Sequence, residues 1–169
     1  MKRRLMWACA VLATAMLAML ALSATALVPA SAATTTTTAE LTGIRVGRHA
    51  TFDRVVLDLT GPSPTVSHRF VTTLTADPSD RPVILPCPTR TERFLLVTAR
   101  PAAAHNENGQ ATYRGPGAFC TPSLRNVRAV GITGDFEGVL SIGLGLRHRA
   151  WVHVFTLTGP SRVVIDIGR

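Results

Sequence analysis

The residues that could carry catalysis lie far apart along this chain of 169 residues. Of its five histidines, only His148 and His153 are near each other in the sequence. A zinc hydrolase needs clustered histidines and acids, and a glycoside hydrolase needs two carboxylates across a cleft. The closest acids, Asp135 and Glu137, lie in a predicted turn, and the chain has no Gly-x-Ser-x-Gly nucleophile elbow. We therefore expect a protein that is not an enzyme and that uses no metal and no cofactor.

The cysteines are better suited to a structural role. Cys87 and Cys120 lie among loop residues, whereas Cys9 belongs to an N-terminal segment that export would remove. Two cysteines in an exported domain most simply pair with each other. Neither has a second cysteine or a histidine at zinc-motif spacing. We predict a Cys87–Cys120 disulfide, which would stabilise the fold by roughly 3–4 kcal/mol in the chain-entropy account.

The arginines suggest binding. After residue 32 the chain has 15 arginines, no lysine and ten acidic residues, which gives a net charge of +5. Arginine grips a carboxylate or a phosphate with two hydrogen bonds. We therefore expect an anionic partner, such as wall phosphates, muropeptide carboxylates or acidic lipids. The alternative is that these arginines are solvated surface residues that reflect codon usage.

Three of these arginines are candidate ligand-binding residues on predicted strands. Arg54 and Arg162 open two related strings, Arg-Val-Val-Leu-Asp-Leu and Arg-Val-Val-Ile-Asp-Ile, and lie opposite the apolar face of each. Together with Arg45 they would offer a surface for wall carboxylates or phosphates. In the alternative, each arginine pairs with an aspartate of its own or of a neighbouring strand and supports the sheet. The alternative carries more weight, because the nearby aspartates partly cancel the charge.

Arg147, Arg149 and Trp151 form a second candidate ligand-binding patch, at the start of a predicted strand. Carbohydrate-binding surfaces need exposed aromatic rings, and Trp151 beside two arginines could supply one. The alternative is that Trp151 belongs to the core. Most of the six phenylalanines fit core positions, and Tyr113 lies in a long loop where it could be exposed.

The N-terminus has the pattern of an export signal. Residues 1–32 combine a basic start, a long apolar run and the small residues Ala30, Ser31 and Ala32 of a cleavage site. The alternative is an uncleaved membrane anchor, since the apolar run is long enough to span a bilayer. Residues 33–40 form a threonine-rich tether. Export argues against nucleic acid as the polyanionic partner and predicts a secreted or cell-envelope location.

The rest of the chain, residues 41–169, alternates between apolar and polar residues with a period of two, which is typical of strands. Turn residues separate many short segments, so we expect an all-β domain, most simply a single β-sandwich of short antiparallel strands. The best helix candidate is one turn at residues 101–104. Residues 100–122 have no strand pattern and form one long irregular loop. The predicted strands cover residues 41–47, 54–59, 66–70, 83–85, 94–98, 126–132, 139–146, 150–157 and 162–167.

Several strings in this body resemble the AMIN and AMIN-like domains. The resemblance rests on LTGIRVGRH at 41–49, FDRVVLDL at 52–59, AAAH at 102–105, TYRGP at 112–116, GDFEGVL at 134–140, GLGL at 143–146 and RVVIDI at 162–167. The string Gly-Asp-Phe-Glu-Gly is the most specific of these, and the whole set looks like the AMIN-like proteins that actinobacteria secrete.

The resemblance implies a β-sandwich of two small sheets. AMIN domains of cell-wall amidases and of secretin-type pore proteins are non-catalytic modules that bind peptidoglycan, whereas the AMIN-like group has no established activity. No catalytic domain follows the last strand here, so we expect a free-standing module.

Three functions remain open at this point. The first is a secreted, non-catalytic module of the cell envelope that binds peptidoglycan or an associated anionic wall polymer. The second is a protein-interaction module that docks onto an envelope protein through a sheet edge. The third is an enzyme of unrecognised type centred on the long loop.

Overall fold

The computed structural model describes residues 37–87 and 93–169. Twelve strands make up its regular structure, and no helix is present in these two ranges. The strands are β1 (Ala39–Arg48), β2 (Phe52–Thr60), β3 (Thr65–Val71), β4 (Thr75–Ala76), β5 (Arg81–Pro82), β6 (Phe94–Arg100), β7 (Ala102–Ala103), β8 (Ala118–Cys120), β9 (Val127–Phe136), β10 (Val139–Leu146), β11 (Val152–Leu157) and β12 (Arg162–Gly168).

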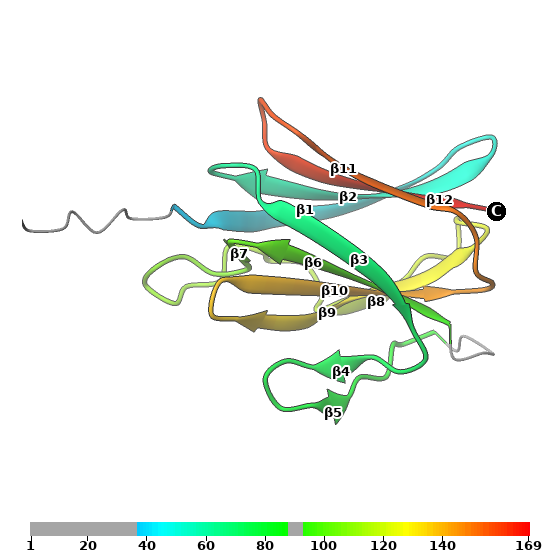
Figure 1. Ribbon diagram of the computed structural model, residues 1–169, viewed down its shortest axis with the longest axis horizontal. Coiled ribbons are helices and arrows are strands. Elements are labelled where there is room, and N and C mark those ends of the chain that lie inside the picture. Colours follow the sequence, from blue (N-terminus) through cyan, green and yellow to red (C-terminus); the bar gives the residue numbers. More distant parts are fainter. Residues whose placement is uncertain (1–36, 88–92) are drawn as a thin grey trace, which may run out of the picture. The chain divides into compact units, whose positions relative to one another are not determined.

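Two five-stranded sheets form the layers of a β-sandwich (Figure 1). Sheet A has the strand order β11-β12-β2-β1-β7, and sheet B has the order β3-β6-β10-β9-β8. Neighbouring strands are antiparallel except β1 and β7, which pair in parallel. The expected all-β class and sandwich architecture are therefore confirmed.

The core lies between the sheets and is built from aliphatic side chains. On β2 the residues Val55, Leu57 and Leu59 are buried, while the residues between them face outward and are less buried. Burial of this apolar area supplies most of the free energy that favours folding. The opposing side chains include Leu95 and Val97 on β6. Phe70, Phe94 and Phe119 pack partly buried against the core and none of the six phenylalanines is fully buried, so the expectation that most of them fill the core holds for only half.

Two further expectations about secondary structure are wrong. Residues 101–104 do not form a helical turn, because Ala102 and Ala103 pair with β1 and are buried, and the Ala102 amide donates to the Gly138 carbonyl. Residues 83–85 are not a strand either. Prolines on both sides of this segment lack N–H donors, and the short pairing in this region involves β4 and β5 instead.

A covering segment, which we define as residues 72–87, crosses the outer face of sheet B and contains the β4–β5 hairpin (Figure 1). Its buried Leu74 and Leu85 lie where side chains on Gly143 and Gly131 would project, and a Cβ at either glycine would fall within 2.7 Å of a leucine methyl. The glycines therefore let the segment pack closely on the sheet. Its end is joined to β8 by the predicted Cys87–Cys120 disulfide, with Cα atoms 5.6 Å apart.

The two related strings identified in the sequence become neighbours. β2 and β12 pair antiparallel at the centre of sheet A. The Gly-Pro turns that accompany them also meet, since the hydroxyls of Ser63 and Ser161 lie 3.2 Å apart. The resemblance between the strings therefore corresponds to a local approximate twofold arrangement of two adjacent strands.

The expected signal peptide and residues 33–36 of the expected tether lie outside the described residues. β1 begins at Ala39, within the last two residues of that tether. In the part of the chain that is described, no helix is long and apolar enough to cross a membrane.

Candidate functional site

The outer face of sheet A brings together three of the expected ligand-binding arginines. The Arg54 guanidinium donates two hydrogen bonds to the Asp166 carboxylate, at 2.6 and 2.7 Å. Arg45 on β1 donates two bonds of 2.6 Å to Asp58 on β2. Arg162 lies opposite Asp58 in the register of β12 and β2, and donates to the carbonyl of Pro160 at 3.4 Å. Arg45 and Arg54 thus pair with aspartates of neighbouring strands, as the structural alternative predicts, whereas Arg162 takes part in none of the salt bridges of the described residues.

An aromatic row crosses the same face and has Arg54 at its centre. The Arg54 guanidinium carbon lies 5.2 Å from the centre of the Phe52 ring and 5.9 Å from that of Phe155. Phe52 in turn stacks on His49, with centroids 4.4 Å apart, and lies 6.1 Å from the Trp151 ring. We call these five residues the aromatic row. A cation held over aromatic faces in this way stabilises the arrangement and keeps the rings in place.

Trp151 presents one face of its indole to solvent. The side chain is 55% exposed, which makes it a surface residue and not part of the core. Its pyrrole edge lies over Gly168, where an added Cβ would come within 2.5 Å of Nε1. Because more than half of the side chain is exposed, the indole is accessible to a ligand.

A buried polar network holds the end of the sandwich that carries Trp151. The Asp53 carboxylate, fully buried on β2, accepts hydrogen bonds from the amides of Asn126 and Val127. The Asn126 side chain donates to the Gly168 carbonyl and accepts from the amides of Arg147 and His148. The loop that precedes β11 is therefore tied to both sheets. No sequence pattern indicates this role for Asp53 and Asn126.

The other two arginines of the second predicted patch do not contact the aromatic row. The Arg149 guanidinium carbon lies 5.1 Å from the centre of the Phe70 ring on β3, in sheet B. Arg147 is exposed in the β10–β11 loop. The expected patch is therefore divided. Trp151 joins Arg54 on the outer face of sheet A, whereas Arg149 is directed toward the edge of sheet B.

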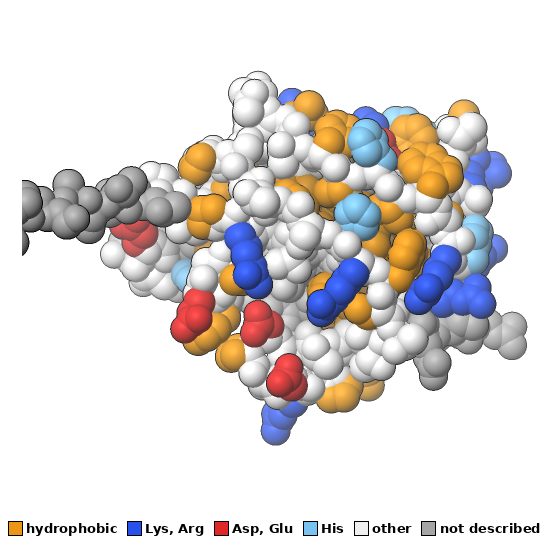
Figure 2. All heavy atoms as spheres, in the orientation of Figure 1, with side chains coloured by type: hydrophobic (Ala, Val, Ile, Leu, Met, Phe, Trp, Pro, Cys, Tyr) orange, Lys and Arg blue, Asp and Glu red, His pale blue; other side chains and the backbone are white. Residues whose placement is uncertain are grey.

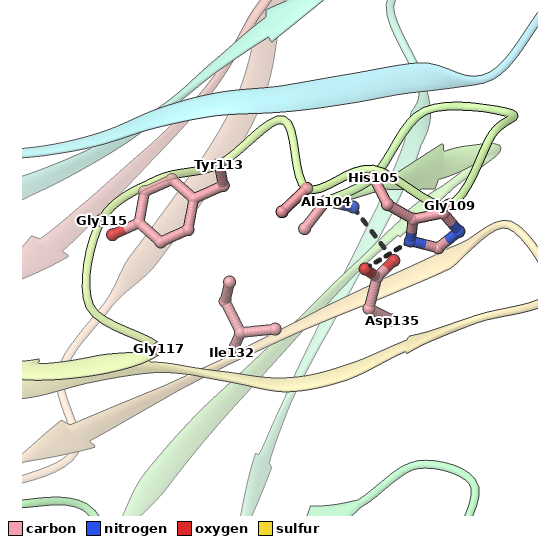
Figure 3. Close-up of a pocket in the computed structure, with 9 residues that line it drawn as sticks. Ala104, His105, Gly109, Tyr113, Gly115, Gly117, Ile132 and Asp135 are labelled. Carbon is pink, nitrogen blue, oxygen red and sulfur yellow. Dashed lines mark hydrogen bonds and ion pairs between the residues drawn. The ribbon is translucent and has the colours of Figure 1, made fainter.

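An open pocket lies beside the long loop (Figure 3). His105 Nδ1 lies 2.7 Å from Asp135 Oδ2, and the other carboxylate oxygen accepts a hydrogen bond from the Ala104 amide. Tyr113 and Ile132 form the facing walls of an open pocket of about 610 Å³. Three of the strings that carry the family resemblance, at 102–105, 112–116 and 134–140, contribute lining residues here.

The sequence does not indicate the His105–Asp135 pair, because its two residues are 30 positions apart and meet only through the fold. Asp135 lies on β9 and not in the turn, which is formed by Glu137 (φ 48°) and its neighbour. The pair, with its bond to the Ala104 amide, has the geometry to anchor the start of the long loop on sheet B.

The electrostatics of both sites follow from these contacts. The hydrogen bonds from Arg45 to Asp58 raise the pKa of Arg45, and those from Arg54 to Asp166 raise the pKa of Arg54. Burial raises the pKa of the Tyr113 phenol. Burial, with Arg125 nearby, lowers the pKa of Arg169, whose guanidinium donates to the carbonyls of His49 and Ala50 and so holds the β1–β2 turn.

In residues 37–87 and 93–169, no group of three or more His, Cys, Asp or Glu side chains is close enough together to hold a metal ion.

Comparison with known proteins identifies a family. The family described as the AMIN-like domain matches residues 39–169, which run from the first residue of β1 to Arg169. No curated protein and no solved structure matches the chain.

Proposed function

Because this chain belongs to the AMIN-like domain family, a family that points to a cell-wall-related module, we propose that it is an exported, non-catalytic module that binds peptidoglycan or an associated anionic wall polymer. The ligand binds on the outer face of sheet A, across the aromatic row of His49, Phe52, Arg54, Trp151 and Phe155. The observation that carries this proposal is the exposed Trp151 indole, supported on Gly168 and continued by Phe52 and Arg54.

The chemistry of the row suits a glycan with acidic groups. Sugar rings present C–H groups that stack on aromatic faces, and the exposed Trp151 indole offers such a face, 6.1 Å from a Phe52 ring that is itself covered by His49 and Arg54. Contiguous exposed apolar surface of this kind marks interaction sites on soluble proteins. His49 and His153 add donors and acceptors for hydroxyl groups.

The arginines of this face act mainly by positioning. Arg54 already donates two hydrogen bonds to Asp166, and Arg45 donates two to Asp58. Of the three, Arg162 makes the weakest side-chain contact, a 3.4 Å bond to the Pro160 carbonyl. Arg162 is therefore the residue of this face best placed to contact a ligand carboxylate or phosphate.

Co-sedimentation with purified sacculi tests the proposal. We expect the wild-type protein to sediment with sacculi, and Trp151→Ala combined with Phe155→Ala to lower the affinity by roughly tenfold or more, since central aromatic contacts are commonly worth over 1 kcal/mol each. The matched control is Phe136→Ala, because Phe136 is 44% exposed but lies at the end of β9 in sheet B. Circular dichroism checks that each variant is folded.

Sacculi stripped of teichoic acids separate the two ligand classes. If binding is undiminished, the ligand is the glycan–peptide mesh. If binding is lost, the ligand is the anionic polymer. If folded double-variant protein sediments as well as wild type, the aromatic row is not the binding surface.

Docking onto an envelope protein is the second candidate. It is favoured by β11, which is the last strand in the order of sheet A and so has a free backbone edge for an added strand. This candidate is supported over the first if the protein sediments with neither sacculus preparation and co-purifies with one envelope protein. The substitution Thr156→Pro should then abolish the co-purification.

A further inference from the structure

A cleft on the outer face of sheet B differs in chemistry from the aromatic row. It has a volume of about 550 Å³ and lies between the covering segment and the exposed sides of β3, β6 and β10. Its lining is rich in serine and threonine and includes Arg69, Arg100, Asp77 and Asp80. Figure 2 shows this face of the domain, with a row of basic side chains and several acidic side chains beside one end of that row.

The charges in the cleft are sorted by sign. Arg69 lies on β3 and Arg100 ends β6, at one side of sheet B. Asp77 and Asp80 belong to the covering segment, and the Asp77 backbone pairs with Gly134 on β9, two strands beyond β6. β10 contributes Ser141 between them. Since adjacent strands are about 4.8 Å apart, β9 lies roughly 10 Å from β6 and roughly 14 Å from β3 across the floor.

The opposite charges do not neutralise each other. Three salt bridges are present in the described ranges, and none involves Arg69, Arg100, Asp77 or Asp80. All four residues are exposed. Their charges are therefore available to a ligand that enters the cleft.

The floor of the cleft holds a buried hydroxyl group that lacks a partner. Thr133 lines the cleft, is only 4% exposed, and its Oγ1 makes no hydrogen bond. Its methyl group is directed at Gly143, where an added Cβ would lie 2.8 Å away. Buried polar groups are nearly always hydrogen-bonded, and each exception requires an explanation. Oγ1 is itself covered from solvent, so a rotation of the Thr133 side chain would bring it to a polar ligand in the cleft.

We propose that this cleft binds a zwitterionic amino-acid or short-peptide group. Its carboxylate is bound by Arg69 and Arg100, its ammonium group by Asp77 and Asp80, and its peptide groups by the hydroxyls of the floor. The proposal is independent of glycan binding on sheet A, because the cleft lies on the outer face of the other sheet.

Three matched dipeptides test this recognition by charge. Alanyl-alanine carries both charges, N-acetyl-alanyl-alanine keeps only the carboxylate, and alanyl-alanine amide keeps only the ammonium group. Titrations of the ¹⁵N-labelled protein, followed by amide chemical shifts, should show that alanyl-alanine binds at least tenfold more tightly than either blocked dipeptide. The shifts should fall on the residues that line the cleft, Thr133 and Ser141 among them. Equal binding of all three dipeptides, shifts confined to other surfaces, or no shifts at all would overturn the proposal.

Charge-deleting variants separate recognition from a structural role. Arg69→Gln should weaken binding of alanyl-alanine and its N-acetyl form and leave the amide unaffected. Asp80→Asn should weaken binding of alanyl-alanine and its amide and leave the N-acetyl form unaffected. Asparagine tolerates the positive φ of 52° at this position. Arg81→Gln is the control, since Arg81 is exposed in the same segment but does not line the cleft. If Arg69→Gln and Asp80→Asn weaken all three dipeptides equally, the residues only shape the cleft and the assignment fails. Sacculus binding is measured separately, so either proposal can fail alone.

Discussion

Arg54 and Asp166 face each other across β2 and β12 and are joined by two hydrogen bonds of 2.6 and 2.7 Å. The pairing follows from the sequence spacing. Both strands carry an arginine followed by an aspartate four residues on, and antiparallel pairing places each arginine opposite the other strand's aspartate. Only one of the two pairs closes, because Asp58, which lies opposite Arg162, is bound by Arg45 of β1. The arginine–aspartate contacts of this face therefore extend over three strands, β1, β2 and β12.

Loss of Arg54 should destabilise the fold. The Asp166 side chain is only 9% exposed, so Arg54→Gln removes the donors of a nearly buried carboxylate. The expected cost is about 1–3 kcal/mol in the free energy of unfolding. Urea denaturation followed by circular dichroism measures it.

The matched variant is Arg45→Gln. Its ion pair has the same geometry, but the Arg45 side chain is 62% exposed and solvent screens the charges. We expect Arg45→Gln to change the urea midpoint far less than Arg54→Gln. Equal effects of the two substitutions would mean that burial does not govern the strength of these pairs.

Gly168→Ala should displace the Trp151 indole. An added Cβ would lie 2.5 Å from Nε1, which is closer than any packed contact allows, and the exposed ring can rotate away. We expect the tryptophan emission to shift and the affinity for sacculi to fall, while the urea midpoint changes little. An unchanged emission spectrum would show that the ring does not rest on Gly168.

The strands and the two-layered architecture could be predicted from sequence because they depend on local alternation. Val55, Leu57 and Leu59 alternate with Arg54, Val56 and Asp58, and the structure buries the first set as expected. The error over the phenylalanines has a physical cause. Phe52 and Phe155 occupy outward positions on β2 and β11, where they contact Arg54 instead of the core.

The two binding surfaces could not be predicted in this way because both depend on long-range pairing. Trp151 and Phe52 are adjacent only because β12 pairs with both β11 and β2. The cleft on sheet B exists only because the covering segment lies over the glycines of β9 and β10. Strand register between segments roughly 100 residues apart is not encoded in the alternation of a single segment.

Reduction of the disulfide should weaken the covering segment and the cleft together. Cys87 and Cys120 are 33 residues apart in sequence, and a closed loop of this length contributes roughly 3–4 kcal/mol by limiting the unfolded chain. We expect the double variant Cys87→Ser/Cys120→Ser to lower the urea midpoint accordingly. Amide exchange should rise more in residues 72–87 than in β2 or β12. A uniform rise in exchange would contradict local release of the segment.

The phenol of Tyr113, the only tyrosine in the chain, should ionise at a higher pH in the folded protein than in the unfolded one. Its ring lies over Gly115, its hydroxyl donates to the Pro116 carbonyl at 3.2 Å, and burial raises its pKa above the ordinary value of 10.0. Because the folded state favours the neutral phenol, the fold loses no stability from this group below about pH 10. Stability falls as the pH rises from the unfolded pKa toward the folded one, since the unfolded chain then releases its proton first.

Absorbance at the phenolate band, recorded in buffer and in urea, measures both midpoints of the Tyr113 titration. Tyr113→Phe is the control, because it should abolish both the absorbance change and this part of the alkaline loss of stability. A native midpoint at or below the denatured one would show that the ring is solvated and that the wall of the His105–Asp135 pocket is open at Tyr113.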